Sequence, residues 1–418
     1  MLLPVCFPLF DAFRPVFTRS RTHQLVCGIL VGMMLAVGDV TMTNVYLSLM
    51  TYAPDTLKRY WSLEQVLRRR QWQVEDLIAA FVSFLLSNVV HGRFCFIADG
   101  THTTTQGKKQ EARGFRPNPH YRKGYQNQSK FLAGNDILSL SLLMDEATES
   151  GRIQRFCFAL GGVLLRAANK RTREIPTFIR LIKRIVPKGS VILFDRKGND
   201  AKTINALADD YCYITRLNAN AVFYRDSKCK EKFDIKEQAL AVEKRKQDKV
   251  YRSHHICYRR GVKKPVLVVA EWFYNRPKRR WRIVYYLCTS TELKPERVIE
   301  EYTLRRSIET THSDSKLFTG FEDCRLHSKE SIEAWCCLSR IATGILEYLR
   351  WRLAHSTAYE HSTDAVLDAV KMHWYHPHQL TRGLVCAFLR HSLLATLINP
   401  KNSEAGFFCN QPLETLSP

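Results

Sequence analysis

The sequence predicts an α/β protein in which helices cover both faces of a mixed sheet and further helical regions lie at both ends. Three observations predict this class. Apolar runs of strand length begin at Phe94, strand and helix patterns alternate after residue 177, and helical periodicity fills residues 10–90. With 418 residues the chain is long enough for two or three domains.

The first 90 residues are expected to be helical. The predicted helices lie near 22–37, 41–50, 55–70 and 73–90. The break at Gly38, followed by threonines that can cap the next helix, is similar to a helix-turn-helix, but a plain helical bundle explains the pattern equally well. Arg68, Arg69 and Arg70 would contact phosphates or form a solvated helix face.

The sheet is predicted from five apolar runs separated by helices and turns. The expected strands are 94–98, 137–144, 156–165, 191–194 and 211–217, with helices near 177–185 and 199–209. Three antiparallel strands, 250–258, 266–273 and 281–287, form an inserted β-region. A single helix is then expected at 295–317, another at 328–355, and further helices within 362–397.

The charge balance indicates a protein that binds a polyanion. The chain carries 63 Lys and Arg against 40 Asp and Glu, a formal charge of +23. For a charge excess of this size nucleic acid is favoured over an anionic lipid surface. The apolar run 25–37 is too short to cross a bilayer and is expected to form a buried helix. The 13 cysteines form no CxxC pair, which disfavours a zinc site and is typical of reduced thiols in the cytoplasm.

Two aspartates follow apolar strands. Asp99 comes after Phe94–Ala98 and Asp195 after Val191–Phe194, so both are expected at the carboxyl ends of neighbouring strands. An aspartate at such a position often only caps a turn. Two carboxylates brought together would repel each other, and a cation would relieve that repulsion.

A third acidic residue lies in a helical motif. At about 100° per residue, Tyr302, Arg305, Glu309 and Lys316 fall within an arc of about 60° on one helix face. Leu304 and Ile308 take the other side, where they can pack on the sheet. A solvated polar face is the alternative interpretation.

The spacing Tyr-x2-Arg-x3-Glu-x6-Lys resembles the signature of bacterial insertion-sequence transposases of the DDE type, in the group with a β-strand insertion before the catalytic Glu. The resemblance includes Asp99 in Ile-Ala-Asp-Gly-Thr and Asp195 in Phe-Asp-Arg-Lys-Gly, and covers roughly residues 90–350. Gly100 and the Arg-Lys-Gly after Asp195 depart from the commoner family pattern.

The resemblance implies an RNase H-like catalytic core and cut-and-paste transposition of DNA. Asp99, Asp195 and Glu309 would be the catalytic residues and would hold two Mg²⁺ or Mn²⁺ ions. Tyr302, Arg305 and Lys316 would bind phosphates of the element end. Trp281, in the basic and aromatic inserted region, would capture a displaced base or pack in a small sheet. A homodimer on DNA, associated with the bacterial nucleoid and independent of membranes, is expected.

Together these patterns divide the chain into five parts: a helical DNA-binding region (1–90), the first part of the catalytic core (91–217), the inserted β-region (218–296), the second part of the core (297–357) and a helical C-terminal region (358–418). Two alternatives to a transposase remain within nucleic-acid biology: a divergent DDE nuclease or integrase, and an inactive, domesticated DNA-binding protein. A membrane-surface protein is a third alternative.

Overall fold

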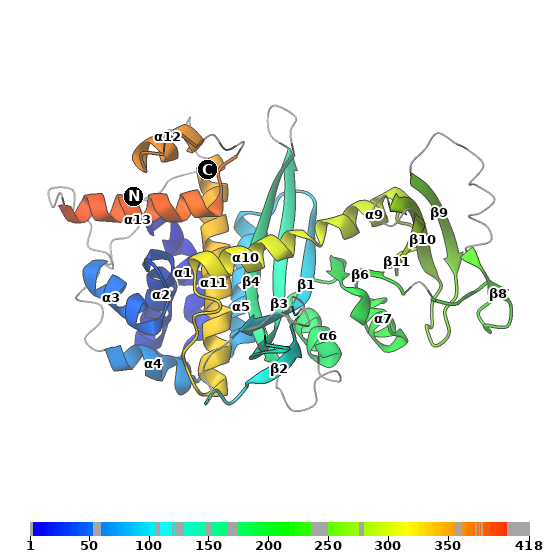
Figure 1. Ribbon diagram of the computed structural model, residues 1–418, viewed down its shortest axis with the longest axis horizontal. Coiled ribbons are helices and arrows are strands. Elements are labelled where there is room, and N and C mark those ends of the chain that lie inside the picture. The colour runs from blue at the N-terminus through cyan, green and yellow to red at the C-terminus, as the bar shows by residue number, and fades with distance from the viewer. Residues whose placement is uncertain are drawn as a thin grey trace.

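The computed structural model describes most of the chain between residues 3 and 398 (Figure 1). The segments outside the description are 1–2, 53–59, 105–108, 119–120, 122–128, 148–152, 166–173, 219, 236–249, 276–279, 356–361, 373, 376, 378 and 399–418. The helices and strands below are those of the described residues.

A mixed sheet runs through the centre of the molecule. Its strands are β1 Phe94–Thr104, β2 Gly114–Pro117, β3 Phe131–Ala147, β4 Ile153–Leu165, β5 Val191–Phe194, β6 Cys212–Arg216, β9 Val250–Cys257, β10 Val266–Asn275 and β11 Arg280–Cys288. The order is β2-β3-β1-β5-β6-β11-β10-β9, and β4 pairs with β3. Strands β1, β5 and β6 are parallel, whereas β3 and β4 are antiparallel to their neighbours. The predicted mixed α/β sheet is therefore confirmed.

Alternate side chains of the central strands enter two separate hydrophobic clusters. Phe96 and Phe194 pack in the larger cluster with helices α6 (Glu174–Ile185) and α7 (Ala201–Leu207). Ile97 and Leu193 pack in the smaller cluster on the opposite face, together with Leu304 and Ile308. This period of two follows from the strand geometry. It fixes which residues of β1 and β5 face the helices that follow residue 295.

The three strands of the inserted region belong to the main sheet. Strand β11 pairs antiparallel with β6 through Tyr286–Arg216, and β10 and β9 continue outward from β11. They form the end of the molecule farthest from the N-terminal helices (Figure 1). A separate short pair, β7 Phe223–Tyr224 and β8 Lys232–Phe233, precedes them.

The long helix α11, Lys329–Ala354, lies along the edge strand β4 and supplies partners for its backbone. Glu347 Oε1 accepts a hydrogen bond from the Cys157 amide at 2.7 Å, and Glu333 Oε1 accepts one from the Leu164 amide at 3.0 Å. Unpaired backbone groups on a buried edge are costly. Side chains of α11 therefore take the place of a further strand.

The N-terminal and C-terminal helices gather around α11, and the last of the N-terminal helices also packs on β4 and α6 (Figure 1). They are α1 Phe7–Phe13, α2 Ser20–Leu35, α3 Met42–Tyr52, α4 Tyr60–Arg68, α5 Val74–Asn88, α12 Ser362–Ala369 and α13 Arg382–Ile398, with 3₁₀ turns at Leu3–Cys6 and Arg14–Val16. Thr41 Oγ1 accepts from the Asn44 amide, as predicted for a cap at the start of α3. In the part of the chain that is described, no helix is long and apolar enough to cross a membrane.

The predicted single helix at 295–317 is wrong. The chain forms α9, Pro295–Leu304, and α10, Ser307–Phe318, with a break at Arg305 and Arg306. Around the break the amides bond three residues back, as in Arg305 to Tyr302 at 3.1 Å and Ile308 to Arg305 at 3.2 Å. This tighter 3₁₀ pattern interrupts the α-helical period on which the predicted arc of 60° depended.

Candidate functional site

Asp99 lies inside strand β1 rather than at its end, which corrects the prediction. The antiparallel pairing with β3 continues to Thr104, because β3 is long enough to match it and threonine is favoured in strands. The parallel pairing with β5, however, stops at Ile97. Asp99 therefore stands just past the paired end of β5, on the same face as Ile97.

Asp195 follows β5 directly, as predicted. Its carboxylate accepts a hydrogen bond from the Lys197 amide at 2.9 Å and caps the short turn Arg196–Gly198. Burial raises the pKa of the Asp195 carboxyl, and the negative charge of Asp99 raises it further, while the Lys197 amide, Lys197 and Arg305 oppose the rise. The negative charges of the two aspartates therefore repel each other at one edge of the sheet.

The break between α9 and α10 brings Arg305 against the first aspartate. Arg305 Nη1 lies 3.3 Å from Asp99 Oδ1, and its Nη2 lies 3.5 Å from Glu309 Oε1. One guanidinium group therefore bridges the two carboxylates. The side chain of Glu309 is 63% exposed and that of Asp99 is 20% exposed, so the bridge spans from the sheet toward solvent.

Tyr302 lies on α9 and Lys316 on α10, the two helices that flank Arg305. The ring centroid of Tyr302 is 5.2 Å from that of Tyr286 on β11. Burial raises the pKa of Tyr302, with Asp195 adding to the rise and Arg305 opposing it. Lys316 Nζ lies 2.8 Å from Glu322 Oε1, near the end of β1. Tyr302 is therefore close enough to Asp195 for the charge of that carboxylate to affect its pKa. Lys316 pairs with Glu322, a partner that the sequence pattern did not indicate.

Trp281 does not join this group. It lies on β11 opposite Tyr274, and the two ring centroids are 5.6 Å apart. Along a strand, five residues span about 16 Å, which separates Trp281 from Tyr286. The alternation of side chains also directs Trp281 to the opposite face from Tyr286 and Tyr302. Its predicted role in base capture stays a prediction.

His312 contacts the site and was not predicted. Its Nε2 lies 3.7 Å from Asp99 Oδ2, one turn after Glu309 on α10. Burial lowers the pKa of His312 to about 4, and the buried cation Arg340 lowers it too, so the ring is neutral near pH 7. Its three-residue spacing from Glu309 on a helix is the signal that would have indicated it.

A second ion pair borders the site on the other face of β1. Lys197 Nζ lies 3.1 Å from Glu174 Oε1. A Cβ atom added to Gly100 would lie 2.3 Å from the same Glu174 oxygen. The glycine after Asp99, which departs from the commoner family pattern, is thus where the Glu174 carboxylate approaches the backbone of β1.

The acidic residues do not form a closed set of metal ligands. Among the described residues, no group of three or more His, Cys, Asp and Glu side chains is arranged to hold an ion. Asp99 and Asp195 are electrostatically coupled, and the Arg305 guanidinium separates Asp99 from Glu309. The arrangement combines three carboxylates with basic groups that can meet phosphates.

Comparison with known proteins gives one family. Residues 91–345, from the start of the sheet into α11, match the family model described as transposase DDE domain. The match covers more than half of the chain and includes Asp99, Asp195 and Glu309. No curated protein gives a significant match.

Proposed function

This chain belongs to the family of transposases with a DDE domain, and we propose that it cuts the ends of a mobile DNA element and joins them to target DNA by a cut-and-paste route. The family makes it a transposase that acts on DNA, and its central sheet an RNase H-like core. Beyond the family, we propose the route of the reaction, the catalytic and DNA-binding residues, the metal ions and the number of protomers on DNA.

One observation carries the assignment of the catalytic residues. Asp99 and Asp195 share one edge and one face of the sheet, and Arg305 connects Asp99 to Glu309 at the start of α10. Three carboxylates from separate parts of the sequence thus surround one group of basic side chains. We assign Asp99, Asp195 and Glu309 as the catalytic residues of the transposase.

These carboxylates suit divalent ions. Two like-charged aspartates, one with a pKa raised by burial and by the other's charge, form a pair whose repulsion a cation would relieve. Carboxylate oxygens are the ligands that Mg²⁺ and Mn²⁺ prefer. Asp99, Asp195 and Glu309 would hold two such ions, which when bound supply activation of the attacking oxygen and stabilisation of the leaving oxygen.

The basic and phenolic side chains would bind the DNA backbone. Arg305 presents a planar fork that matches either a carboxylate or a phosphate, so a phosphate of the element end would compete with Asp99 and Glu309 for it. Lys316 would exchange Glu322 for a phosphate in the same way. Tyr302, whose pKa is raised, stays protonated and would donate its hydroxyl hydrogen to a phosphate oxygen.

The parts outside the core would recognise the element. Residues 1–90 would bind element DNA, and Trp281 in the region 218–296 would stack on a displaced base, because its ring is exposed beside arginines of the same strand. Two ends must be joined in one reaction, so we propose a dimer on DNA. The proposed division of the chain has three further parts: the two segments of the catalytic core, 91–217 and 297–357, and the C-terminal part 358–418.

The experiment uses the purified chain and DNA that carries the two ends flanking its gene. With Mg²⁺, the wild type should nick and join these ends. Asp195→Ala, Asp99→Asn and Glu309→Gln should each abolish cleavage, yet they should still bind the ends. Asp209→Asn is the matched control, because Asp209 is an exposed acid paired with Lys264 away from the sheet edge. Metal-dependent cleavage by Asp195→Ala would overturn the catalytic assignment.

A further inference from the structure

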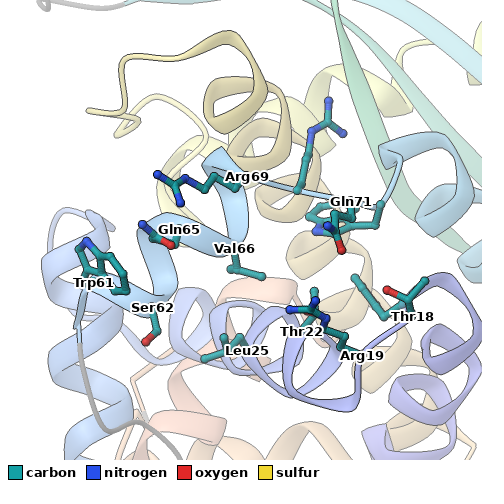
Figure 2. Close-up of a pocket in the computed structure, with 13 residues that line it drawn as sticks. Thr18, Arg19, Thr22, Leu25, Trp61, Ser62, Gln65, Val66, Arg69 and Gln71 are labelled. Atoms are coloured by element: carbon teal, nitrogen blue, oxygen red, sulfur yellow. The ribbon is translucent and has the colours of Figure 1, made fainter.

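A pocket of about 390 Å³ opens between the start of α2 and helix α4 (Figure 2). Thr18, Arg19 and Thr22 lie on one side of it, and Trp61 and Gln65 of α4, with Arg69 just after the end of that helix, lie on the other. Its volume is within the usual range of ligand sites, roughly 300–1,000 Å³. We call it the α2–α4 pocket. It is separate from the carboxylates on the sheet.

Two buried hydrogen-bond donors of the pocket lining have no acceptor. Trp72 is 3% exposed, and its indole Nε1 has no hydrogen-bond partner among the described residues. Arg70 uses Nη2 for an ion pair with Glu333, but its buried Nη1 has no partner in the same part of the chain. A buried donor left unpaired is destabilising. The wall of the pocket thus contains buried polar nitrogens rather than only apolar groups.

The mouth of the pocket carries positive charge and one exposed aromatic ring. Arg19 and Arg69 are exposed, and neither makes an ion pair with any residue that the structure describes. No described Asp or Glu lines the pocket. Trp61 is 58% exposed. An anion with a flat apolar group attached to it satisfies both features, whereas inorganic phosphate would leave the indole unused.

We propose that the α2–α4 pocket binds one unpaired nucleotide of DNA, with the phosphate on Arg19 and Arg69 and the base stacked on Trp61. The inference rests on the proposed function, because the nucleotide would belong to the DNA on which the transposase acts. Stacking on an aromatic side chain requires a free base face, which a base inside a duplex does not offer.

The test measures binding of the full chain to a fluorescent oligothymidylate and to duplex element ends, over a range of salt concentrations. Trp61→Ala should weaken oligothymidylate binding about tenfold. Arg19→Ala and Arg69→Ala should weaken it too, and each should reduce the slope of log affinity against log salt by about one. Trp374→Ala is the matched control, because Trp374 is 74% exposed on the C-terminal segment and should leave affinity unchanged.

The outcomes separate the two proposals. A wild type that binds and cleaves element ends, with Trp61→Ala and Arg69→Ala binding oligothymidylate as tightly as it does, would overturn the pocket and leave the function intact. A wild type that neither binds nor cleaves the ends would overturn the function itself. Displacement of the oligonucleotide by inorganic phosphate, combined with an unchanged affinity of Trp61→Ala, would show a site for the ion alone and contradict binding of a nucleotide.

Discussion

Arg305 Nη1 lies 3.3 Å from Asp99 Oδ1, across 206 positions of sequence. The contact joins the middle of β1 to the break between α9 and α10, and the second terminal nitrogen of the same guanidinium group faces Glu309. A residue expected to bind DNA thus also compensates the charge of two expected catalytic carboxylates. Replacing Arg305 should therefore affect both the binding of DNA and the charge balance of the carboxylates.

Arg305→Ala should weaken binding of element ends and lower strand joining by about 10-fold to 100-fold, the equivalent of losing a hydrogen bond to a charged group. Arg305→Lys keeps the charge but not the planar fork, so its rate should fall between those of Ala and the wild type. Rates of cleavage and joining are measured together with thermal unfolding. An unchanged rate combined with lost thermal stability would favour a structural role.

Asp195→Asn should stabilise the metal-free protein at neutral and alkaline pH. Burial raises the folded-state pKa of Asp195 above its unfolded value of about 4, so its ionised form costs stability. Stability from this group is highest at acid pH and falls as the pH rises through the raised pKa. With a chelator present, the variant should melt a degree or two higher at pH 8 and approach the wild type near pH 4.

Asp209→Asn provides the control of opposite sign. The ion pair with Lys264 lowers the pKa of the Asp209 carboxyl, so the ionised form is favoured in the folded state. Removing that charge should bring no gain in melting temperature at pH 8. Adding Mg²⁺ should raise the melting temperature of the wild type and of Asp209→Asn, but much less that of Asp195→Asn. Equal gains in all three would contradict an ion at Asp195.

Gly100→Ala should impair both folding and reaction. The new Cβ would lie 2.3 Å from Glu174 Oε1, so the carboxylate that pairs with Lys197 must shift. The atoms that must shift are the ends of flexible side chains, so the loss of stability should be smaller than the ~1–3 kcal/mol of core overpacking. Gly28→Ala is the control, because its Cβ would meet Leu49 at an ordinary 3.8 Å inside α2, where alanine is the better helix former. Chemical denaturation compares the two, and equal stability would refute the clash.

The sequence allowed the order of the main elements and one of the acidic positions to be predicted well. Asp195 was placed directly after a short apolar strand, and β5 ends at Phe194 as expected. Leu304 and Ile308 are buried as the helical pattern predicted. These features follow from local apolar periodicity, which reports burial whatever the distant partners are.

The remaining details depend on contacts that no local pattern contains. β1 extends past Asp99 because the distant β3 pairs with its threonines. The break at Arg305 places its guanidinium beside a carboxylate 206 positions away, and Glu174 approaches Gly100 from α6. The strands of 218–296 were predicted, but their union with the main sheet depends on the β6–β11 pairing. Contacts between distant parts of the sequence therefore determine these details, which the periodicity of apolar residues does not predict.

Glu347→Gln should destabilise the protein by about 3–5 kcal/mol, because it breaks a buried set of charges. Glu347 accepts from the Cys157 amide on β4 and pairs with Arg350 at 2.7 Å, while Arg382 lies between it and Asp314 on α10. The neutral side chain would leave two buried arginines with one remaining carboxylate. The exposed pair Arg225 and Glu231 supplies the control, since Glu231→Gln should cost less than about 1 kcal/mol. Urea unfolding measures both, and a similar small loss in Glu347→Gln would mean that the edge of β4 does not depend on this carboxylate.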